Sequence, residues 1–240
     1  MRNISPALLV IAFFLFSSSS FIQLFSSQKV SATITDDRLI EASGLEESYL
    51  NPGYFWTHND SGSEAILYLI GPNGLIVMEV RLNGVENRDW EEIVTVNKGS
   101  ESLIYVAETG DNRAIYENVQ LICLKEPKYT GKAKVEIPET ELKTMNFRYE
   151  EGARDAEALL YDTNFDEFVL VTKREENAMV YSFPFVPNQK PINIKSKGTV
   201  PSKLFTAADM NEDGEILLKH YSAIYYWEKS NERALDRILN

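Results

Sequence analysis

Short apolar runs follow one another along the chain and are separated by turn-forming residues. Residues 66–70 (ILYLI), 103–107 (LIYVA) and 167–173 (EFVLVTK) are typical of these runs. They are rich in Ile, Val, Leu, Tyr and Phe, which favour pleated strands. Gly, Pro, Asn and Asp stand between them, as at residues 51–53 (NPG) and 211–214 (NEDG), and tight hairpins require such residues. Because no helical periodicity intervenes, the pattern predicts an all-β protein.

Three segments recur in the same order four times along the chain. The first is a short motif, found at Glu41–Leu45, Asp89–Ile93, Asp155–Leu159 and Thr206–Met210. A turn, a second strand and a third strand follow each copy, and a further strand is expected at residues 76–82. Antiparallel strands that repeat about every 50 residues are typical of propeller blades, which stack because one blade cannot bury both of its faces.

The sequence therefore predicts a β-propeller over residues 33–240, with blades that begin near residues 41, 89, 155 and 206. An ordinary β-sandwich is the alternative, because its strands also alternate with turns. A sandwich does not explain why the same segments recur in one order. The interval between the second and third copies is the longest. We expect residues 128–148 within it to form an extended outer hairpin or a loop over one face.

The first 32 residues have the features of a signal peptide. Arg2 provides a positive charge, residues 7–16 (ALLVIAFFLF) are apolar, and residues 30–32 (VSA) offer small side chains for cleavage. The uncharged stretch from residue 3 to residue 28 is also long enough for an uncleaved membrane anchor, so both interpretations stay open. In either case we expect an exported protein, whether extracellular, periplasmic or held in the cell envelope.

The charge of the chain limits its partners. It has 36 acidic and 24 basic residues, which gives a net charge of −12. Because an acidic surface repels phosphate backbones, we exclude nucleic acid and expect a small-molecule or protein ligand. Contact with a membrane is expected only if the N-terminal segment is retained. The single cysteine, Cys123, rules out an internal disulfide, so packing must stabilise the fold.

Acidic residues recur at the start of the repeats, where the innermost strand of a blade lines the central channel. The candidate metal ligands are Glu41, Asp89, Glu91, Asp155, Glu157 and Asp209. Carboxylates that converge in a channel need a counter-charge, and Ca²⁺, which takes about six to eight oxygen ligands, would supply it. The alternative is that these acids are structural and accept hydrogen bonds from the backbone or from Arg88 and Arg154.

A second group of polar residues follows the second strand of each repeat. We expect these residues to form ligand-binding loops: Asn59, Asp60, Glu108, Asp111, Asn112, Lys173 and Arg174. The only two histidines, His58 and His220, stand in equivalent places and are the candidate general bases. The structural alternative is that Asn59 or Asp60 forms an Asx-turn before Gly62. No sequence motif specifies a nucleophile.

Six motifs in one order resemble those of a family of exported bacterial β-propeller-like proteins. They are Glu41–Leu45 (EASGL), His58–Gly62 (HNDSG), Asn87–Glu91 (NRDWE), Glu108–Asn112 (ETGDN), Glu126–Pro127 (EP) and Arg154–Leu159 (RDAEAL). The resemblance spans about residues 38–228 and implies a fold but no activity. A looser similarity links such proteins to six-bladed calcium-dependent lactonases and phosphotriesterases and to phytase-like esterases. That similarity rests on fold, so it implies activity only by analogy.

Two differences from the family pattern stand out. Relatives read Asp-Ile-Gly-Asp-Asn where this chain has ETGDN at residues 108–112, and they continue beyond the fourth repeat with a segment that contains a Gly-Glu-Ala-Ile-like motif. Four repeats can close as a small ring or form an incomplete one. We predict a secreted propeller that binds a ligand or partner through its channel or face loops. The alternative is a calcium-dependent hydrolase of esters, lactones or phosphoesters.

Overall fold

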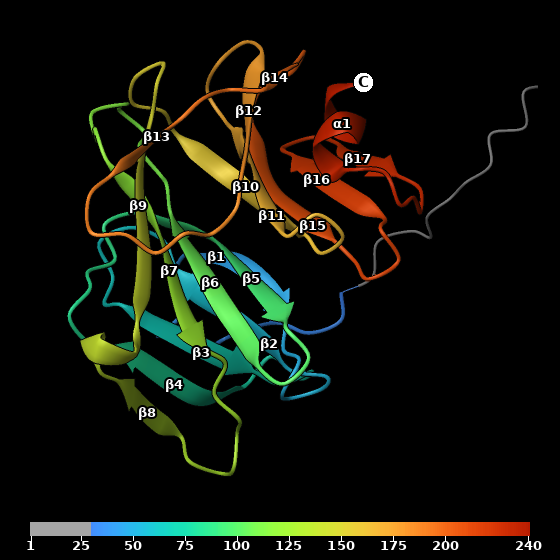
Figure 1. Ribbon diagram of the computed structural model, residues 1–240. Helices are drawn as coiled ribbons and strands as arrows, with labels where there is room; N and C mark the ends of the chain where they lie inside the picture. The colour runs from blue at the N-terminus through green and yellow to red at the C-terminus, as the bar shows by residue number, and fades with distance from the viewer. Residues whose placement is uncertain (1–29) are drawn as a thin grey trace, which may run out of the picture. The chain divides into compact units, whose positions relative to one another are not determined.

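The four sequence repeats fold as four sheets arranged in a ring, a four-bladed β-propeller (Figure 1). This is a computed structural model, and it describes residues 30–240. The predicted all-β propeller is therefore confirmed. Of the expected signal peptide or anchor at residues 1–32, residues 1–29 lie outside the described residues. Within residues 30–240, no helix combines the length and the hydropathy needed to cross a membrane.

The first strand of each blade lies at the centre of the ring. These innermost strands are β1 (Ala42–Glu47), β5 (Trp90–Asn97), β10 (Ala156–Asp162) and β15 (Phe205–Met210). Strand β1 packs beside β5, β5 beside β10, and β10 beside β15. The fourth blade reaches the first where the Tyr49 hydroxyl donates a hydrogen bond to Glu212 at 3.2 Å. The channel is thus bordered by one strand from every blade.

The outer strands follow the apolar runs of the sequence, because hairpin turns bound each run. The second strands are β2 (Phe55–Asn59), β6 (Ser102–Glu108), β11 (Glu167–Thr172) and β16 (Ile216–His220). The third strands are β3 (Ile66–Ile70), β7 (Val119–Lys125), β12 (Ala178–Phe183) and β17 (Ile224–Trp227). Fourth strands complete the first three blades: β4 (Ile76–Leu82), β9 (Lys143–Tyr149) and β14 (Gly198–Val200).

The hydrophobic core lies between the blades. Three clusters fill the spaces between blades 1 and 2, blades 2 and 3, and blades 3 and 4. In the first cluster, Trp56 of β2 and Trp90 of β5 are fully buried. In the second, the rings of Tyr105 and Phe168 meet edge to face, with 4.8 Å between their centroids. Because blades bury their faces against their neighbours, stacking of the blades stabilises the fold.

After the third strand of blades 2, 3 and 4, the chain returns to the preceding blade. Strand β8 (Lys134–Ile137) pairs in parallel with β4 of blade 1, and β13 (Ile192–Ile194) pairs in parallel with β9 of blade 2. After β17, helix α1 (Ala234–Leu239) packs on blade 3, where Asp162 accepts a hydrogen bond from the Ala234 amide at 2.7 Å. We name β8, β13 and α1 the return segments.

The return segment β8 replaces the outer hairpin or loop that the sequence predicted for residues 128–148. Strand β8 lies on blade 1, a short 3-10 turn follows at Glu139–Glu141, and β9 then becomes the fourth strand of blade 2. The physical reason is the edge of β4, whose backbone groups would otherwise lack partners across the sheet. The extra residues therefore join two blades instead of extending one.

A β-bulge interrupts each innermost strand near its start. The strand register passes over Gly44 in β1, Glu91 in β5, Glu157 in β10 and Thr206 in β15. A bulge inserts one residue that has no partner across the ladder and redirects its side chain. Two of the four bulges carry a glutamate, so blades 2 and 3 each present one carboxyl group where their inner strand begins.

Candidate functional site

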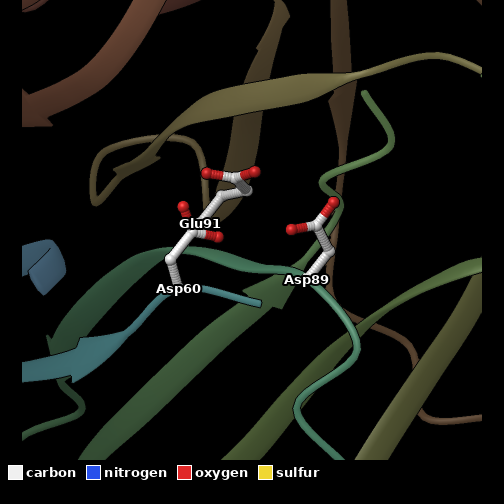
Figure 2. A group of neighbouring side chains, drawn as sticks. All are labelled: Asp60, Asp89 and Glu91. Carbon is white, nitrogen blue, oxygen red and sulfur yellow. The ribbon is translucent and has the colours of Figure 1, made fainter. Parts of the chain in front are cut away.

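Five acidic side chains meet at the end of the channel where the innermost strands begin, which we name the channel mouth. Asp60, Asp89 and Glu91 form a first group, and Glu91, Asp155 and Glu157 form a second. In each group, ligand oxygens lie within 4.8 Å of one another. All of these side chains except Asp60 are buried. Figure 2 shows the first group, whose carboxyl groups come from two neighbouring blades and border a common space.

Backbone geometry explains why these acids converge. Asp60 follows β2, which runs antiparallel to β1, so it lies at the end of the sheet where the innermost strands start. Asp89 immediately precedes β5, and the bulge in β5 redirects Glu91. Gly110, in the loop after β6, lies against both side chains. A Cβ atom at Gly110 would be 2.7 Å from Oδ2 of Asp89 and closer still to Glu91, so a larger residue would displace these side chains.

The second group has its own positive charges. Lys173 forms an ion pair with Glu157, and Nε of Arg174 donates a hydrogen bond to Oδ2 of Asp155 at 2.6 Å. The amide of Asp111 donates to the other oxygen of Asp155 at 2.9 Å. Buried carboxylates that are paired and hydrogen-bonded in this way are satisfied. The alternative that the acids have a structural role is therefore supported directly for Asp155 and Glu157.

The carboxyl groups of the first group have no such basic partner among the described residues. Within residues 30–240, no lysine or arginine forms an ion pair with Asp60, Asp89 or Glu91, and the adjacent Arg88 pairs with Glu108 instead. Oδ1 of Asp89 is buried and accepts no hydrogen bond from the described protein. An unsatisfied buried carboxyl oxygen costs free energy, which a bound cation would offset.

Burial and mutual repulsion raise the pKa values of Asp89 and Glu91. Burial, followed by the charges of Asp60 and Asp155, raises the pKa of Asp89 to about 6. Burial, followed by the charges of Glu157 and Asp60, raises the pKa of Glu91 to about 10. Each carboxyl group can become neutral by taking a proton, or it can keep its charge beside a cation. A cation and protons therefore compete for this group.

The remaining loop residues selected from the sequence have partners within the protein. Asn59 accepts a hydrogen bond from the Ile40 amide, and Glu108 accepts one from Gln120. Asp111 accepts one from the Tyr116 amide, and Asn112 accepts one from Arg174. Asn59 also donates to the Arg38 carbonyl at 2.7 Å, which fixes the segment before β1. Lys173 and Arg174 lie at the channel mouth, where they pair with acids as described above. Asp60 is the loop residue that joins the first group.

Neither histidine belongs to the two acid groups. His58 is fully buried, and its ring meets Trp90 edge to face at 5.6 Å between centroids. Burial lowers the pKa of His58 to about 4. His220 ends β16, where its Nδ1 accepts a hydrogen bond from the Ser222 amide at 3.1 Å. A general-base role for either stays a prediction, and for His58 it requires the ring to become accessible.

Two of the predicted metal ligands, Glu41 and Asp209, belong to neither group. Glu41 is exposed just before β1, and its backbone carbonyl accepts a hydrogen bond from the Asp60 amide at 2.9 Å. Asp209 lies toward the other end of β15, near Glu46. The bulge explains this placement, because it makes Thr206 equivalent to Glu91, whereas the motif alignment paired Thr206 with Asp89.

Sequence reasoning missed two residues that shape the channel. Gly110 could have been found, because a glycine between the acids of the ETGDN motif marks a close approach of the backbone. Glu46 carries no such signal, because only the folded ring shields it partly from solvent. Its Oε1 accepts hydrogen bonds from the amide and the hydroxyl of Thr95, at 3.0 and 2.9 Å. Burial, followed by the charge of Asp209, raises the pKa of Glu46 to about 8.

The raised pKa of Glu46 predicts a loss of stability with rising pH. The folded state holds the Glu46 proton up to about pH 8, whereas an ordinary glutamate has a pKa of 4.5. The folded protein therefore binds more protons across this window, and its contribution to stability is lost as the pH rises through it. Glu46→Gln keeps the acceptor oxygen without the charge. We expect it to stabilise the protein by about 2 kcal/mol at pH 9 and to have little effect at pH 4.

Denaturant unfolding at both pH values measures this difference. Glu47→Gln is the matched control, because Glu47 is the exposed neighbour on the same strand. The prediction fails if Glu46→Gln gives no more stabilisation at pH 9 than the control does.

Comparisons with known proteins do not indicate a function for this chain, so the functional argument rests on the fold and the site. A scan against protein-family models found no match, and a search of curated proteins found none either. The structure supports the resemblance to propeller-like proteins at the level of the fold. The fold and the acid groups together define the class as a four-bladed β-propeller with a candidate cation site at the channel mouth.

Proposed function

We propose that this protein is an exported binding protein that holds a divalent cation, Ca²⁺ or one like it, at the channel mouth. Through that cation and the surrounding loops it would bind a small-molecule or protein ligand. The supporting observation is Oδ1 of Asp89, which is buried without a partner in a group of three carboxyl groups. The neighbouring acids Asp155 and Glu157 have basic partners, whereas no lysine or arginine of the described residues pairs with Asp60, Asp89 or Glu91.

The ligand set favours a hard cation. Asp60, Asp89 and Glu91 offer only oxygen atoms, and no histidine or cysteine shares either group within the described residues. Such oxygens suit Ca²⁺ and Mg²⁺, whereas zinc sites use nitrogen and sulfur more often. Three carboxylates fill only part of the roughly six to eight positions around Ca²⁺. The remaining positions would accept water or the oxygen atoms of a ligand.

A cation at this place would change what the channel mouth can bind. Without it, the acidic surface repels carboxylates and phosphates. With it, oxygen atoms of a ligand could complete the coordination sphere, and the partly exposed Arg174 would add a second positive charge nearby. Small molecules or protein side chains that carry such oxygens are the partners we propose. The net charge of −12 argues against nucleic acid.

A calcium-dependent hydrolase of esters, lactones or phosphoesters is the second proposal, and one observation favours it. The pKa of Asp89, raised to about 6 chiefly by burial, suits general acid–base catalysis near neutral pH. A cation beside it would polarise a carbonyl or phosphoryl oxygen. Binding is the first proposal because no sequence motif specifies a nucleophile, and His58 is buried.

Export and family membership are also proposals. Export is supported by the charged start, apolar run and small residues of the segment 1–32. Membership of the exported propeller-like family is supported by the motifs, four of which contribute residues at the channel mouth. These are His58–Gly62, Asn87–Glu91, Glu108–Asn112 and Arg154–Leu159.

Thermal unfolding with and without Ca²⁺ tests the cation site. Saturating Ca²⁺ should raise the melting temperature by about 5–10 °C, and chelator should reverse the rise, because a ligand that binds the folded state stabilises it. Asp89→Asn should abolish this response. It should also leave the cation-free protein as stable as before or more stable, because the substitution removes a repelled charge.

The matched control is Asp37→Asn, because Asp37 is exposed in the segment before β1. It should keep the full response to Ca²⁺. The proposal is overturned if Ca²⁺ and chelator leave the wild-type melting curve unchanged. Calcium-dependent hydrolysis of an ester, lactone or phosphoester that Asp89→Asn abolishes would instead favour the second proposal.

A further inference from the structure

A cavity lies at the end of the channel away from the channel mouth. It measures about 560 Å³ and is lined by residues from all four blades. Blade 1 contributes Glu46, blade 2 Val94, blade 3 Leu160 and blade 4 Asp209. Cavities of roughly 300–1,000 Å³ are typical of small-molecule sites. We name it the far cavity.

Apolar side chains form much of the wall of the far cavity. They are Leu45, Pro52, Phe55, Val94, Leu160 and Met210. Leu45 is 60% exposed, although it belongs to an innermost strand, because it borders the open space. Burying such a surface against a ligand is favourable in proportion to the apolar area removed from water. An apolar group on a ligand would therefore favour binding in this cavity.

The charged residues in the wall of the far cavity are all acidic. Its charged residues are Glu46, Glu47, Asp209 and Glu212, and no lysine, arginine or histidine among residues 30–240 lines the cavity. Burial, followed by the charge of Asp209, raises the pKa of Glu46, and burial also raises the pKa of Asp209. At the channel mouth, Lys173 and Arg174 offset part of the acid charge. In the described part of the chain, no basic residue forms an ion pair with the acids that line the far cavity, so a cationic ligand would relieve the repulsion.

The spacing of these acids favours an organic cation over a metal ion as the ligand. Within the described residues, Glu46 and Asp209 belong to no group of three ligands close enough to hold a metal. A metal ion needs several oxygens converging on one point. An ammonium or guanidinium group can be served by carboxylates that stand further apart. The rings of Tyr49 and Phe55 line the same cavity and can attract a cation through their faces.

We propose that the far cavity binds a small organic cation, an ammonium or guanidinium group carried on an apolar body. The charged group lies between Asp209 and Glu46, and the apolar body lies against Phe55, Val94 and Leu160. This site is independent of the divalent cation at the channel mouth, because the two share no residue.

Isothermal titration with phenethylammonium, in the presence of chelator, tests the proposal on the whole protein. The wild type should bind with a Kd of about 1 mM or below. The neutral analogue 2-phenylethanol, which keeps the ring and the chain, should bind at least about tenfold more weakly. Asp209→Asn should weaken phenethylammonium binding about tenfold as well, because it removes a carboxylate and keeps the shape.

Asp213→Asn is the matched control, because Asp213 stands in the turn after β15, outside the cavity lining, and pairs with Lys229. It should leave the affinity unchanged. Absence of saturable binding by the wild type overturns the proposal, as does equal affinity for the neutral analogue or for Asp209→Asn. Because chelator is present throughout, these outcomes are separate from any failure of the divalent-cation site.

Discussion

Trp90→Ala is expected to remove about 3–5 kcal/mol of the free energy of unfolding, the largest loss we predict for one side chain. Trp90 begins β5, is fully buried, and packs with Trp56 and Ile104 in the cluster between blades 1 and 2. Its ring also meets His58 edge to face. Natural domains have a total of only about 5–15 kcal/mol. The variant should therefore unfold at markedly lower denaturant concentration, as measured by tryptophan fluorescence or circular dichroism.

Trp227→Ala is the matched control, since it removes the same side chain from the outer strand of blade 4. Trp227 is only partly buried at the border of its cluster, so we expect a loss below about 2 kcal/mol. Equal losses for the two variants would contradict the view that the contact between blades 1 and 2 depends on the buried Trp90.

Gly110→Ala is expected to weaken cation binding at the channel mouth by at least about 100-fold, which corresponds to about 2.7 kcal/mol. The new methyl group would lie 2.7 Å from Oδ2 of Asp89 and closer still to Glu91, so both carboxyl groups must move apart. Every acid remains in the protein, and only its position changes. Calcium titration by calorimetry measures the loss directly.

Gly71→Ala provides the control for this substitution. Gly71 lies in the turn between β3 and β4, where a Cβ atom would meet only the side chains of Asn73 and Tyr54. It should bind Ca²⁺ with the affinity of the wild type. If Gly110→Ala also binds with that affinity, the cation does not occupy the space among Asp60, Asp89 and Glu91.

The repeating elements could be predicted from the sequence because each rests on local chemistry. The run at residues 66–70 became β3 with the expected bounds, since turn residues flank it. Four acids of the channel mouth could also be predicted, because they recur with the sequence repeat. Asp89, Glu91, Asp155 and Glu157 follow the repeat in two successive blades, and the structure brings all four to the channel mouth.

The rest depends on contacts between distant segments. A bulge adds one residue without changing the apolar pattern, so the sequence could not show that Gly44, Glu91, Glu157 and Thr206 occupy equivalent places. The lack of a basic partner for Asp89 is likewise visible only in the folded ring. Nor could the sequence show that β8 would pair with a strand some 50 residues earlier, since parallel pairing leaves no local signal.

The return segments also fix the order in which a newly made chain can be completed. Blade 1 gains its outermost strand only when residues 134–137 have emerged, by which time three strands of blade 2 have already been made. Blade 2 waits in the same way for residues 192–194, and blade 3 waits for α1. Synthesis runs from the N-terminus at about 5–20 residues per second, so each blade stays unfinished for several seconds. A ribosome that stalls within one repeat therefore leaves an open edge on the blade before it, where chaperones and proteases can recognise an incomplete molecule.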